Sequence, residues 1–366
     1  MKLKKIRISS FRNIDEAELS PGDRFNIIVG KNAQGKTNIL ESIYLLGTMK
    51  SFRMARNTDL IKTGSPCSHL KGWVDRDGIT REVFLSIEQT GKKARVDNKS
   101  VSKPSDFFGC INMVVFSPED IAMVRGLPEL RRRYLDRAVF GGDIRYLAIH
   151  QEFYKVLKNR NSLLKNGITA GLDVWTEKLA EVGSRMIFVR SSYVREISQL
   201  LTEFYATIAG SCEQAAICYR SGAGGKKGSC CTIDEARAGL LETYDENLQE
   251  ELRRGTTLTG PHRDDIELSL DGKVLKIHGS QGEQRSFVLA LKMAEIEYIK
   301  KRYGSPPVLL LDDMTSELDG DRNRNFMEFL IRQDMQVFIT TTSMENLGLT
   351  GKNNYTVYAV HGGKIV

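Results

Sequence analysis

The segment Gly30–Thr37 constrains the fold of this chain more than any other part of it. Its sequence, GKNAQGKT, matches the pattern G-x-x-x-x-G-K-[ST] at every position. An apolar strand over Phe25–Val29 is predicted before this loop, and an amphipathic helix from about Thr37 to Met49 after it. The glycines let backbone N–H groups converge on phosphate oxygens, and the helix start adds a positive dipole. We therefore expect ATP to be bound by eight residues: Gly30, Lys31, Asn32, Ala33, Gln34, Gly35, Lys36 and Thr37.

The chemistry of such a site needs a cation, a magnesium ligand and an acid. Lys36 can reach the β- and γ-phosphates, and Thr37 can give its hydroxyl to a magnesium ion. The apolar run Val308–Leu311 is typical of a central parallel strand, and Asp312 and Asp313 follow it. We expect Asp312 to lie beside the magnesium and Asp313 to orient or deprotonate water. Lys36 and Asp313 are then the catalytic residues.

Both ends of the chain are predicted to contribute to one α/β lobe. The length of 366 residues suits two lobes better than one compact domain. Alternating apolar and polar residues predict strands within 70–115, and further apolar strands are predicted towards the C-terminus. Over 179–204 an apolar residue recurs every three or four positions, which predicts a long helix. We expect an ATPase lobe formed by 1–125 with 256–366, and an inserted helical lobe formed by 126–255.

Composition narrows the possible partners and compartments. Lys and Arg total 53 against 46 for Asp and Glu, so the net charge of +7 permits a polyanionic partner without requiring one. None of the six cysteines forms a C-x-x-C pair, so no structural zinc site is predicted. No stretch approaches eighteen apolar residues, and the N-terminal residues lack the apolar run of a signal peptide. We therefore expect a cytoplasmic protein with reduced thiols and no membrane partner.

Two further motifs resemble those of ABC-type ATPase heads, as found in SMC and related repair proteins. Ser280–Gln284 (SQGEQ) opens a predicted helix before the acidic strand, and Ser316–Asp319 (SELD) follows that strand. They resemble the signature and the D-loop. The resemblance implies an α/β P-loop NTPase fold of the ABC head type, acting as an ATP-dependent homodimer. It also implies that Ser280, Gly282 and Glu283 contact ATP held by a second molecule; the alternative is that Ser280 only caps a helix.

Within that superfamily the chain resembles the RecF family of recombination mediators over essentially its whole length. Besides Gly30–Thr37 and the acidic strand, the resemblance rests on SSFRN at 9–13, FSPED at 116–120, RRRYLD at 131–136, TGPHRDD at 259–265 and GSQGEQR at 279–285. It implies a weak, DNA-stimulated ATPase that uses ATP and Mg²⁺ and binds single-stranded, duplex and gapped DNA. It also implies that the protein works with other recombination mediators to load recombinase at gaps. Roles in replication restart and the SOS response follow from the same resemblance.

Two positions depart from the usual ABC pattern. A threonine, Thr341 by our alignment, stands where these heads carry a switch histidine. Threonine can contact a γ-phosphate but cannot share a proton as histidine does, which predicts slow hydrolysis. The loop that normally offers a glutamine near the magnesium has no clear glutamine, and Ser117–Asp120 is its candidate here.

Several basic residues have two interpretations each. By the resemblance Arg12 reaches the nucleotide; otherwise it is a solvated arginine. Arg131–Arg133 occupy consecutive helical positions and spread over roughly 200° of the helix, so either one or two contact phosphate or the group forms a solvated face. His262 and Arg263 either link the nucleotide site to DNA or to a partner subunit, or stabilise a corner of the fold.

Three other functions fit the sequence less well. The energy module of a membrane transporter would have a switch histidine and a different helical insert. A structural SMC protein would have hundreds of heptad residues between the loop and the signature, and this interval holds only ordinary helices. A nuclease fused to such a head would need a cluster of histidines and acids outside the ATP site, which the sequence does not suggest.

Overall fold

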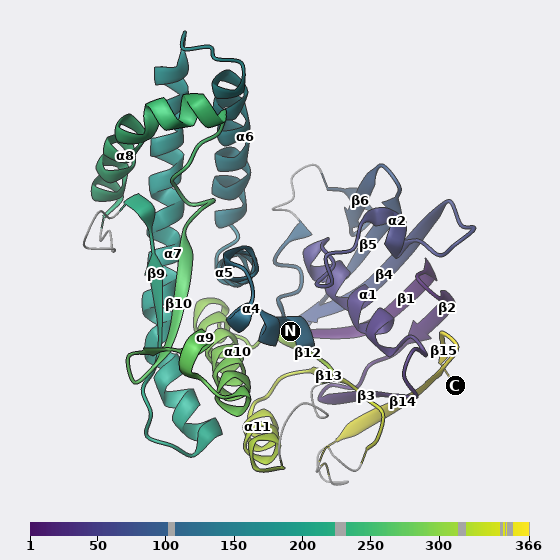
Figure 1. Ribbon diagram of the computed structural model, residues 1–366. Coiled ribbons are helices and arrows are strands. Elements are labelled where there is room, and N and C mark those ends of the chain that lie inside the picture. The colour runs from purple at the N-terminus through teal and green to yellow at the C-terminus, as the bar shows by residue number, and fades with distance from the viewer. Residues whose placement is uncertain are drawn as a thin grey trace. The chain divides into compact units, whose positions relative to one another are not determined.

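The computed structural model describes residues 1–101, 107–223, 232–313, 320–344, 347, 349 and 354–365. The chain divides into two compact units (Figure 1). The first comprises Met1–Ile121, Thr207–Ala209 and Glu295–Val366, and the second comprises Ala122–Ala206 and Gly210–Ala294. Both chain ends lie in the first unit, as in the predicted ATPase lobe. The division differs from the predicted lobes mainly at residues 256–294, which join the second unit. Residues 122–125 also join the second unit, and residues 207–209 join the first.

The first unit contains a largely parallel sheet with the strand order β15-β14-β3-β13-β12-β8. Its strands are β3 (Phe25–Val29), β8 (Met113–Phe116), β12 (Val308–Asp312), β13 (Val337–Thr341), β14 (Tyr355–His361) and β15 (Lys364–Ile365). Only the pair of β14 and β15 is antiparallel. Every residue of β8, β12 and β13 is buried, which explains their continuous apolar sequences. The strands predicted around the phosphate loop and the acids are confirmed.

A second, antiparallel sheet of the first unit has the order β2-β1-β4-β5-β6-β7. Its strands are β1 (Lys2–Phe11), β2 (Ile14–Leu19), β4 (Cys67–Arg76), β5 (Ile79–Glu88), β6 (Gly91–Val96) and β7 (Lys99–Ser100). Helix α1 (Lys36–Thr48) packs against strands of both sheets (Figure 1), and the unit also contains α2 (Asn57–Leu60) and α11 (Gly320–Arg332). The buried residues Ile39, Leu40 and Ile43 of α1 belong to the core that joins the two sheets.

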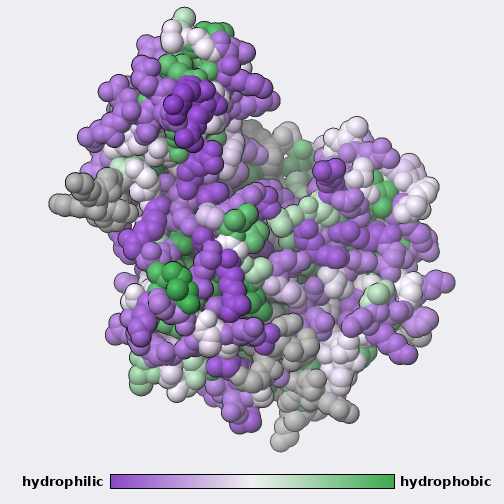
Figure 2. Space-filling view, viewed as in Figure 1, coloured by the Kyte–Doolittle hydropathy of each residue, from purple (hydrophilic) through white to green (hydrophobic). Residues whose placement is uncertain are grey.

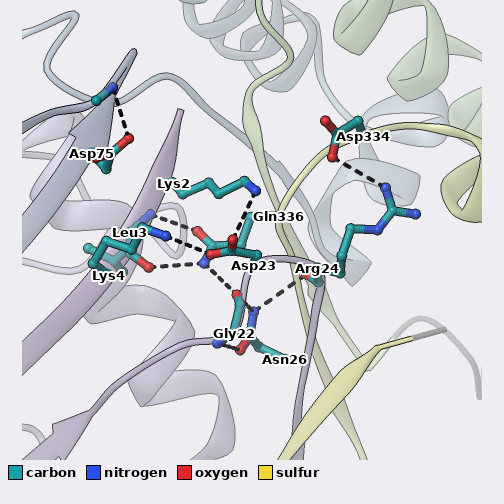
Figure 3. Close-up of polar contacts among 11 residues, drawn as sticks. Lys2, Leu3, Lys4, Gly22, Asp23, Arg24, Asn26, Asp75, Asp334 and Gln336 are labelled. Atoms are coloured by element: carbon teal, nitrogen blue, oxygen red, sulfur yellow. Dashed lines mark hydrogen bonds and ion pairs between the residues drawn. The ribbon is translucent and has the colours of Figure 1, made fainter. Parts of the chain in front are cut away.

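Gln336, immediately before β13, ties the two sheets together (Figure 3). Its Oε1 accepts a hydrogen bond from the Leu3 backbone N–H at 2.7 Å, and its Nε2 donates to the carbonyl oxygens of Leu3 at 2.9 Å and Gly22 at 2.8 Å. The side chain is fully buried, so these bonds satisfy its polar atoms inside the core. An ion pair between Lys2 and Asp23 lies beside it.

The second unit is mainly helical. Its elements include α5 (Pro128–Gly142), α6 (Tyr146–Lys165), α8 (Ile233–Arg254), α9 (Leu275–His278), β9 (Ala215–Arg220), β10 (Asp265–Leu270) and β11 (Lys273–Val274). Three more helices contribute residues to both units: α4 (Pro118–Arg125), α7 (Leu172–Ala209) and α10 (Gln281–Tyr303). The long helix predicted over 179–204 is confirmed as α7.

The segment 126–255, predicted as a helical lobe, also contains the strand β9. Ala215, Ile217 and Tyr219 are buried and are separated by more accessible residues, which is the period of a strand. β9 pairs with β10 in the antiparallel order β11-β10-β9. Because β10 follows residue 256, this pairing brings the segment 256–294 into the second unit.

The visible surface is predominantly hydrophilic, and its hydrophobic residues form separate patches (Figure 2). Within the described ranges, no helix is both long enough and apolar enough to cross a membrane. Isolated exposed apolar side chains, such as those of Ile277 and Leu127, are normal on the surface of a protein.

Candidate nucleotide site

The phosphate loop connects the end of β3 to the first turn of α1, and close backbone contacts require both of its glycines. A Cβ atom at Gly30 would lie 2.5 Å from the carbonyl oxygen of Val360. Gly35 has a φ of 107°, and a Cβ atom there would lie 2.9 Å from Oδ1 of Asn13. The loop therefore keeps its conformation only with glycine at these two positions.

Lys36 folds over the loop from the first residue of α1. Its Nζ donates to the carbonyl oxygens of Gly30 at 2.6 Å and Lys31 at 3.0 Å. Burial lowers the pKa of Lys36 below its ordinary value, while the carboxylates of Asp313 and Asp312 act in the opposite direction. The ammonium is therefore a partly desolvated cation in front of the loop, which suits it to phosphate oxygens.

The adjacent order of β3, β13 and β12 brings Thr37, Thr340 and Asp312 together at the carboxyl ends of parallel strands. Oδ1 of Asp312 accepts from the Thr37 hydroxyl at 2.8 Å and from the Thr340 hydroxyl at 2.9 Å. Burial raises the pKa of Asp312, and the two hydroxyls oppose this rise. A hydroxyl and a carboxylate in contact suit Mg²⁺, which prefers oxygen ligands and usually keeps several waters and phosphate oxygens.

Asp313 extends from the end of the same strand in a left-handed conformation, with a φ of 50°. Its backbone N–H donates to the Thr340 hydroxyl at 2.9 Å. A non-glycine residue with positive φ carries some backbone strain, although aspartate tolerates this region better than most residues. The predicted D-loop residues Ser316–Asp319 lie outside the described residues.

A cavity of about 770 Å³ lies over the phosphate loop, a size typical of small-molecule sites. Arg12, Arg53, Asp59 and Asp313 are among its lining residues, together with the loop from Asn32 to Thr37. All of these residues belong to the first unit. The cavity, the glycines and the paired oxygen ligands together fit a nucleoside triphosphate with its magnesium ion.

Arg12 is not a freely solvated arginine. Its Nε and Nη2 each donate to the Glu41 carboxylate at 2.8 Å, and Glu41 is fully buried on α1. The backbone N–H of Arg12 donates to the Leu60 carbonyl oxygen at 2.9 Å, which attaches the β1–β2 turn to the last residue of α2. A planar guanidinium held by a bidentate pair keeps a defined position on the cavity wall.

The structure distinguishes between two neighbouring threonines at the end of β13. The hydroxyl of Thr341, which we aligned with the switch histidine, donates to the Ser343 carbonyl oxygen at 2.7 Å. Thr340 instead lines the cavity and contacts Asp312. Sequence reasoning missed Thr340, because nothing in the local pattern shows which of two adjacent buried threonines faces the acidic strand.

The segment predicted to replace the glutamine loop begins a helix. Oδ2 of Asp120 accepts from the backbone N–H of Ser117 at 3.0 Å and from its hydroxyl at 3.3 Å. Both residues are buried, and α4 begins at Pro118, a residue type that suits the first position of a helix. β8, which precedes this turn, is the parallel neighbour of β12.

Ser280 and Glu283 form a reciprocal capping box at the start of α10. The Ser280 hydroxyl accepts from the Glu283 N–H at 3.2 Å, and the Glu283 carboxylate accepts from the Ser280 N–H at 2.5 Å. The capping role is therefore present in a single chain. A contact with the nucleotide of another molecule remains a proposal.

The arginine run Arg131–Arg133 on α5 serves three different purposes. Arg131 is buried and forms a bidentate pair with the Asp265 carboxylate at 2.8 and 2.7 Å, so the expectation of a solvated face or phosphate contact is wrong for it. Arg132 donates to the Asp264 carbonyl oxygen at 3.0 Å. Arg133 is exposed and pairs with Glu129 one turn earlier.

The family-specific string at 259–265 is held by buried polar contacts of the second unit. The fully buried Arg190 donates to the Pro261 carbonyl oxygen at 2.6 Å and forms an ion pair with Asp136 at 2.6 Å. Burial raises the pKa of Asp136, but Arg190, His150 and Tyr146 outweigh this effect and lower it to about 2. These contacts favour the corner-stabilising interpretation for the segment that contains His262 and Arg263.

His262 lies in the same corner with its Nε2 3.1 Å from the Thr257 carbonyl oxygen. Because a carbonyl only accepts, Nε2 carries the proton of the neutral ring. Its Nδ1 is buried and has no hydrogen-bond partner among the described residues. Burial lowers the pKa of His262 to about 4, since a second proton would be placed at that nitrogen.

Comparisons with known proteins agree with this geometry. The family model described as "RecF/RecN/SMC N terminal domain" matches residues 2–366. A curated relative, "DNA replication and repair protein RecF" of Geotalea uraniireducens (strain Rf4), is 55% identical over 370 residues that cover 100% of both chains. A solved structure described as "recombination mediator protein RecF-ATPrS in RecFOR pathway" is 32% identical, with a TM-score of 0.90, covering 100% of this chain and 97% of that one. An SMC head bound to the ScpA winged-helix domain shares the fold alone, with a TM-score of 0.58 at 15% identity, covering 100% of this chain and 97% of that one.

Proposed function

Because the chain belongs to the RecF family of DNA replication and repair proteins, we propose that it is an ATP-dependent DNA-binding protein of recombinational repair. It binds ATP with Mg²⁺, dimerises around the nucleotide, and binds single-stranded, duplex and gapped DNA. With other recombination mediators it helps to load recombinase at gaps, with roles in replication restart and the SOS response. Its place of action is the cytoplasm.

One observation carries the nucleotide part of this proposal. Lys36, Thr37 and Asp312 meet at the carboxyl ends of three adjacent strands, and the two hydrogen-bonding oxygens are 2.8 Å apart. Residues Gly30–Thr37 would surround the phosphates, Arg12 would contact the nucleotide from the β1–β2 turn, and Thr37 and Asp312 would hold the magnesium. The ion would neutralise charge on the β- and γ-phosphates.

The remaining residues have roles in slow hydrolysis. Asp313 extends beyond Asp312 and can orient or deprotonate the attacking water. Lys36 would stabilise negative charge on the γ-phosphate. Thr340 and Thr341 occupy the end of β13, and neither hydroxyl can accept and return a proton as an imidazole does. We therefore propose a weak ATPase, which DNA stimulates.

The signature completes the site from a second molecule. Ser280 precedes α10, and Gly282 and Glu283 lie in its first turn, where the helix dipole attracts anions. In a dimer, this helix start would contact the γ-phosphate held by the loop of the other subunit. ADP lacks that phosphate and would not hold the dimer together.

Fluorescence anisotropy tests the DNA part directly. Labelled single-stranded, duplex and gapped DNA are titrated with the full chain in the presence of Mg²⁺ and either ATP, ADP or no nucleotide. We expect ATP to strengthen binding, and affinity to fall steeply with salt because phosphate contacts release counterions. The matched controls are Lys36→Ala, which should remove the ATP effect, and Lys301→Ala, a change of an exposed lysine outside the cavity lining, which should keep it. Equal binding in ATP and ADP would contradict the proposal.

A further inference from the structure

The antiparallel sheet of the first unit has one face in the core and one face towards solvent. Ile6 and Ile8 on β1, Leu70 on β4 and Leu85 on β5 are buried on the inner face. The residues between them therefore point outwards, since successive side chains of a strand alternate between faces. Helix α1 packs on strands β1, β4 and β5, which leaves the opposite face without that helix.

Strand register aligns the outward side chains in rows. One row runs across five strands through Glu18, Arg7, Lys71, Phe84 and Arg95. The row on one side of it contains Lys5, Trp73 and Glu82, and the row on the other side contains Glu16, Ser9, His69, Ser86 and Lys93. Trp73 and Phe84 are diagonal neighbours on β4 and β5, so their attachment points lie roughly 7 Å apart.

Both aromatic rings are surrounded by cations. The side-chain charges of Lys5, Arg7 and Lys71 lie 5.7, 5.5 and 5.1 Å from the Trp73 ring centroid. At Phe84 the guanidinium of Arg95 is 5.9 Å from the centroid, and the ring of His69 stacks at 5.6 Å with an interplanar angle of 24°. Trp73 and Phe84 are only half-buried, whereas His69, Arg7 and Arg95 are exposed.

Acidic residues on this face neutralise only part of its positive charge. Glu18 pairs with both Lys5 and Arg7, and Glu82 pairs with Lys71 at 2.9 Å. Lys93 pairs with Glu88 in the next row at 2.7 Å. With Glu88 included, this face carries five basic side chains and four acidic ones, a net charge of +1: Lys5, Arg7, Lys71, Lys93 and Arg95 against Glu16, Glu18, Glu82 and Glu88.

We propose that this outer sheet face binds single-stranded nucleic acid, with bases stacked on Trp73 and Phe84 and phosphates held by the surrounding cations. Aromatic residues on an open antiparallel sheet, interleaved with basic ones, recognise splayed bases and the backbone that connects them. Lys and Arg are long and flexible, so a cation displaced from a ring by a base can turn to the adjacent phosphate. Stacking of a base is stronger than an exposed cation–π contact, so the exchange is favourable.

This site is separate from the ATP-dependent DNA contact of the proposed function. The inference rests on the proposed function only because both have nucleic acid as the partner. The site requires no nucleotide, since none of its residues lines the cavity over the phosphate loop. It also favours unpaired bases, because the faces of bases inside a duplex are already stacked. Binding here would select the single-stranded part of a gap.

Tryptophan fluorescence reports directly on stacking at Trp73. The chain contains two tryptophans, so Trp175→Phe leaves Trp73 as the single emitter. We expect a short oligothymidylate and a short oligouridylate to quench this emission without ATP, and an oligomer of abasic nucleotides to leave it unchanged. The response to the deoxy and ribo oligomers distinguishes DNA from RNA as the preferred strand. Absence of quenching by both oligomers would overturn the proposal.

Affinity measurements on the full chain separate stacking from folding. Trp73→Ala should weaken oligothymidylate binding about tenfold, whereas Trp73→Tyr, which retains a ring, should restore most of it. ATP-dependent binding to duplex DNA should be unchanged in both variants. An equal loss for single strands and duplex in Trp73→Ala would contradict the stacking role. Quenching at Trp73 without any ATP-dependent DNA binding would instead contradict the proposed function and leave this inference standing.

Discussion

The charged side chain of Lys36 is almost fully buried. Among the described residues, it donates hydrogen bonds only to carbonyl oxygens of its own loop. We expect Lys36→Ala to abolish ATP binding or nearly so, because the loop loses its side-chain cation at the β- and γ-phosphates. Lys36→Arg should bind but hydrolyse poorly, since a planar fork cannot replace a compact ammonium. Calorimetric titration with Mg-ATP measures both variants, with Lys301→Ala, at an exposed lysine outside the cavity lining, as the control. Wild-type affinity in Lys36→Ala would be incompatible with the assigned site.

Two consecutive aspartates allow a second test at the scale of single residues. Asp312 contacts Thr37 and is buried, whereas Asp313 turns away in a left-handed conformation and lines the cavity. We expect Asp312→Ala to weaken the dependence of ATP binding on Mg²⁺. Asp313→Asn should bind ATP normally and slow hydrolysis about a hundredfold, as is typical for loss of a general base. Normal turnover by Asp313→Asn would assign the water-activating role to another residue.

The corner around His262, between α8 and β10, has a predictable response to pH. The folded-state pKa of about 4 lies below the ordinary value of 6.5, so the neutral ring stabilises the fold fully above pH 6.5. That stability is lost as the pH falls towards 4, and the loss is about 2 kcal/mol at pH 5. We therefore expect the thermal midpoint to drop more between pH 7 and pH 5 in the wild type than in His262→Gln. If the thermal midpoints of the wild type and of His262→Gln fell equally between pH 7 and pH 5, His262 would not titrate as described.

At the scale of elements, the sequence predicts what depends on local pattern. Gly30–Thr37 and its flanking strand and helix follow from a short motif and from periodicity, and the structure agrees. The strand β9 is short and lies between long helices, so its three alternating apolar residues were too few to indicate it. The pairing of Arg131 with Asp265 joins residues far apart in the sequence, and composition alone favours a solvated arginine. Long-range pairs of this kind can be identified only once the fold is known. The same holds for the extent of the second unit, which depends on them.

At the scale of the whole molecule, the residues proposed for one ATP site belong to different units. The phosphate loop, Asp312 and Asp313 lie in the first unit, and Ser280 lies in the second. In a single chain, Ser280 already has a complete role, because its hydroxyl and backbone N–H both bond to Glu283. The dimer hypothesis therefore requires a test that keeps the helix cap and changes only the charge at the nucleotide.

Ser280→Asp provides this test, because aspartate caps a helix as well as serine does but repels the γ-phosphate. We expect Lys36→Ala and Ser280→Asp each to lack ATPase activity as homodimers, since both sites of each dimer carry a defect. A mixed dimer combines the intact loop of the Ser280→Asp subunit with the intact signature of the Lys36→Ala subunit. An equal mixture should therefore recover about a quarter of wild-type activity, because half of the dimers are mixed and each has one intact site. Light scattering in ATP and in ADP monitors dimer formation alongside the ATPase assay. Full activity of Ser280→Asp alone would show that Ser280 acts only as a helix cap, and mixed dimers without activity would rule out the shared site.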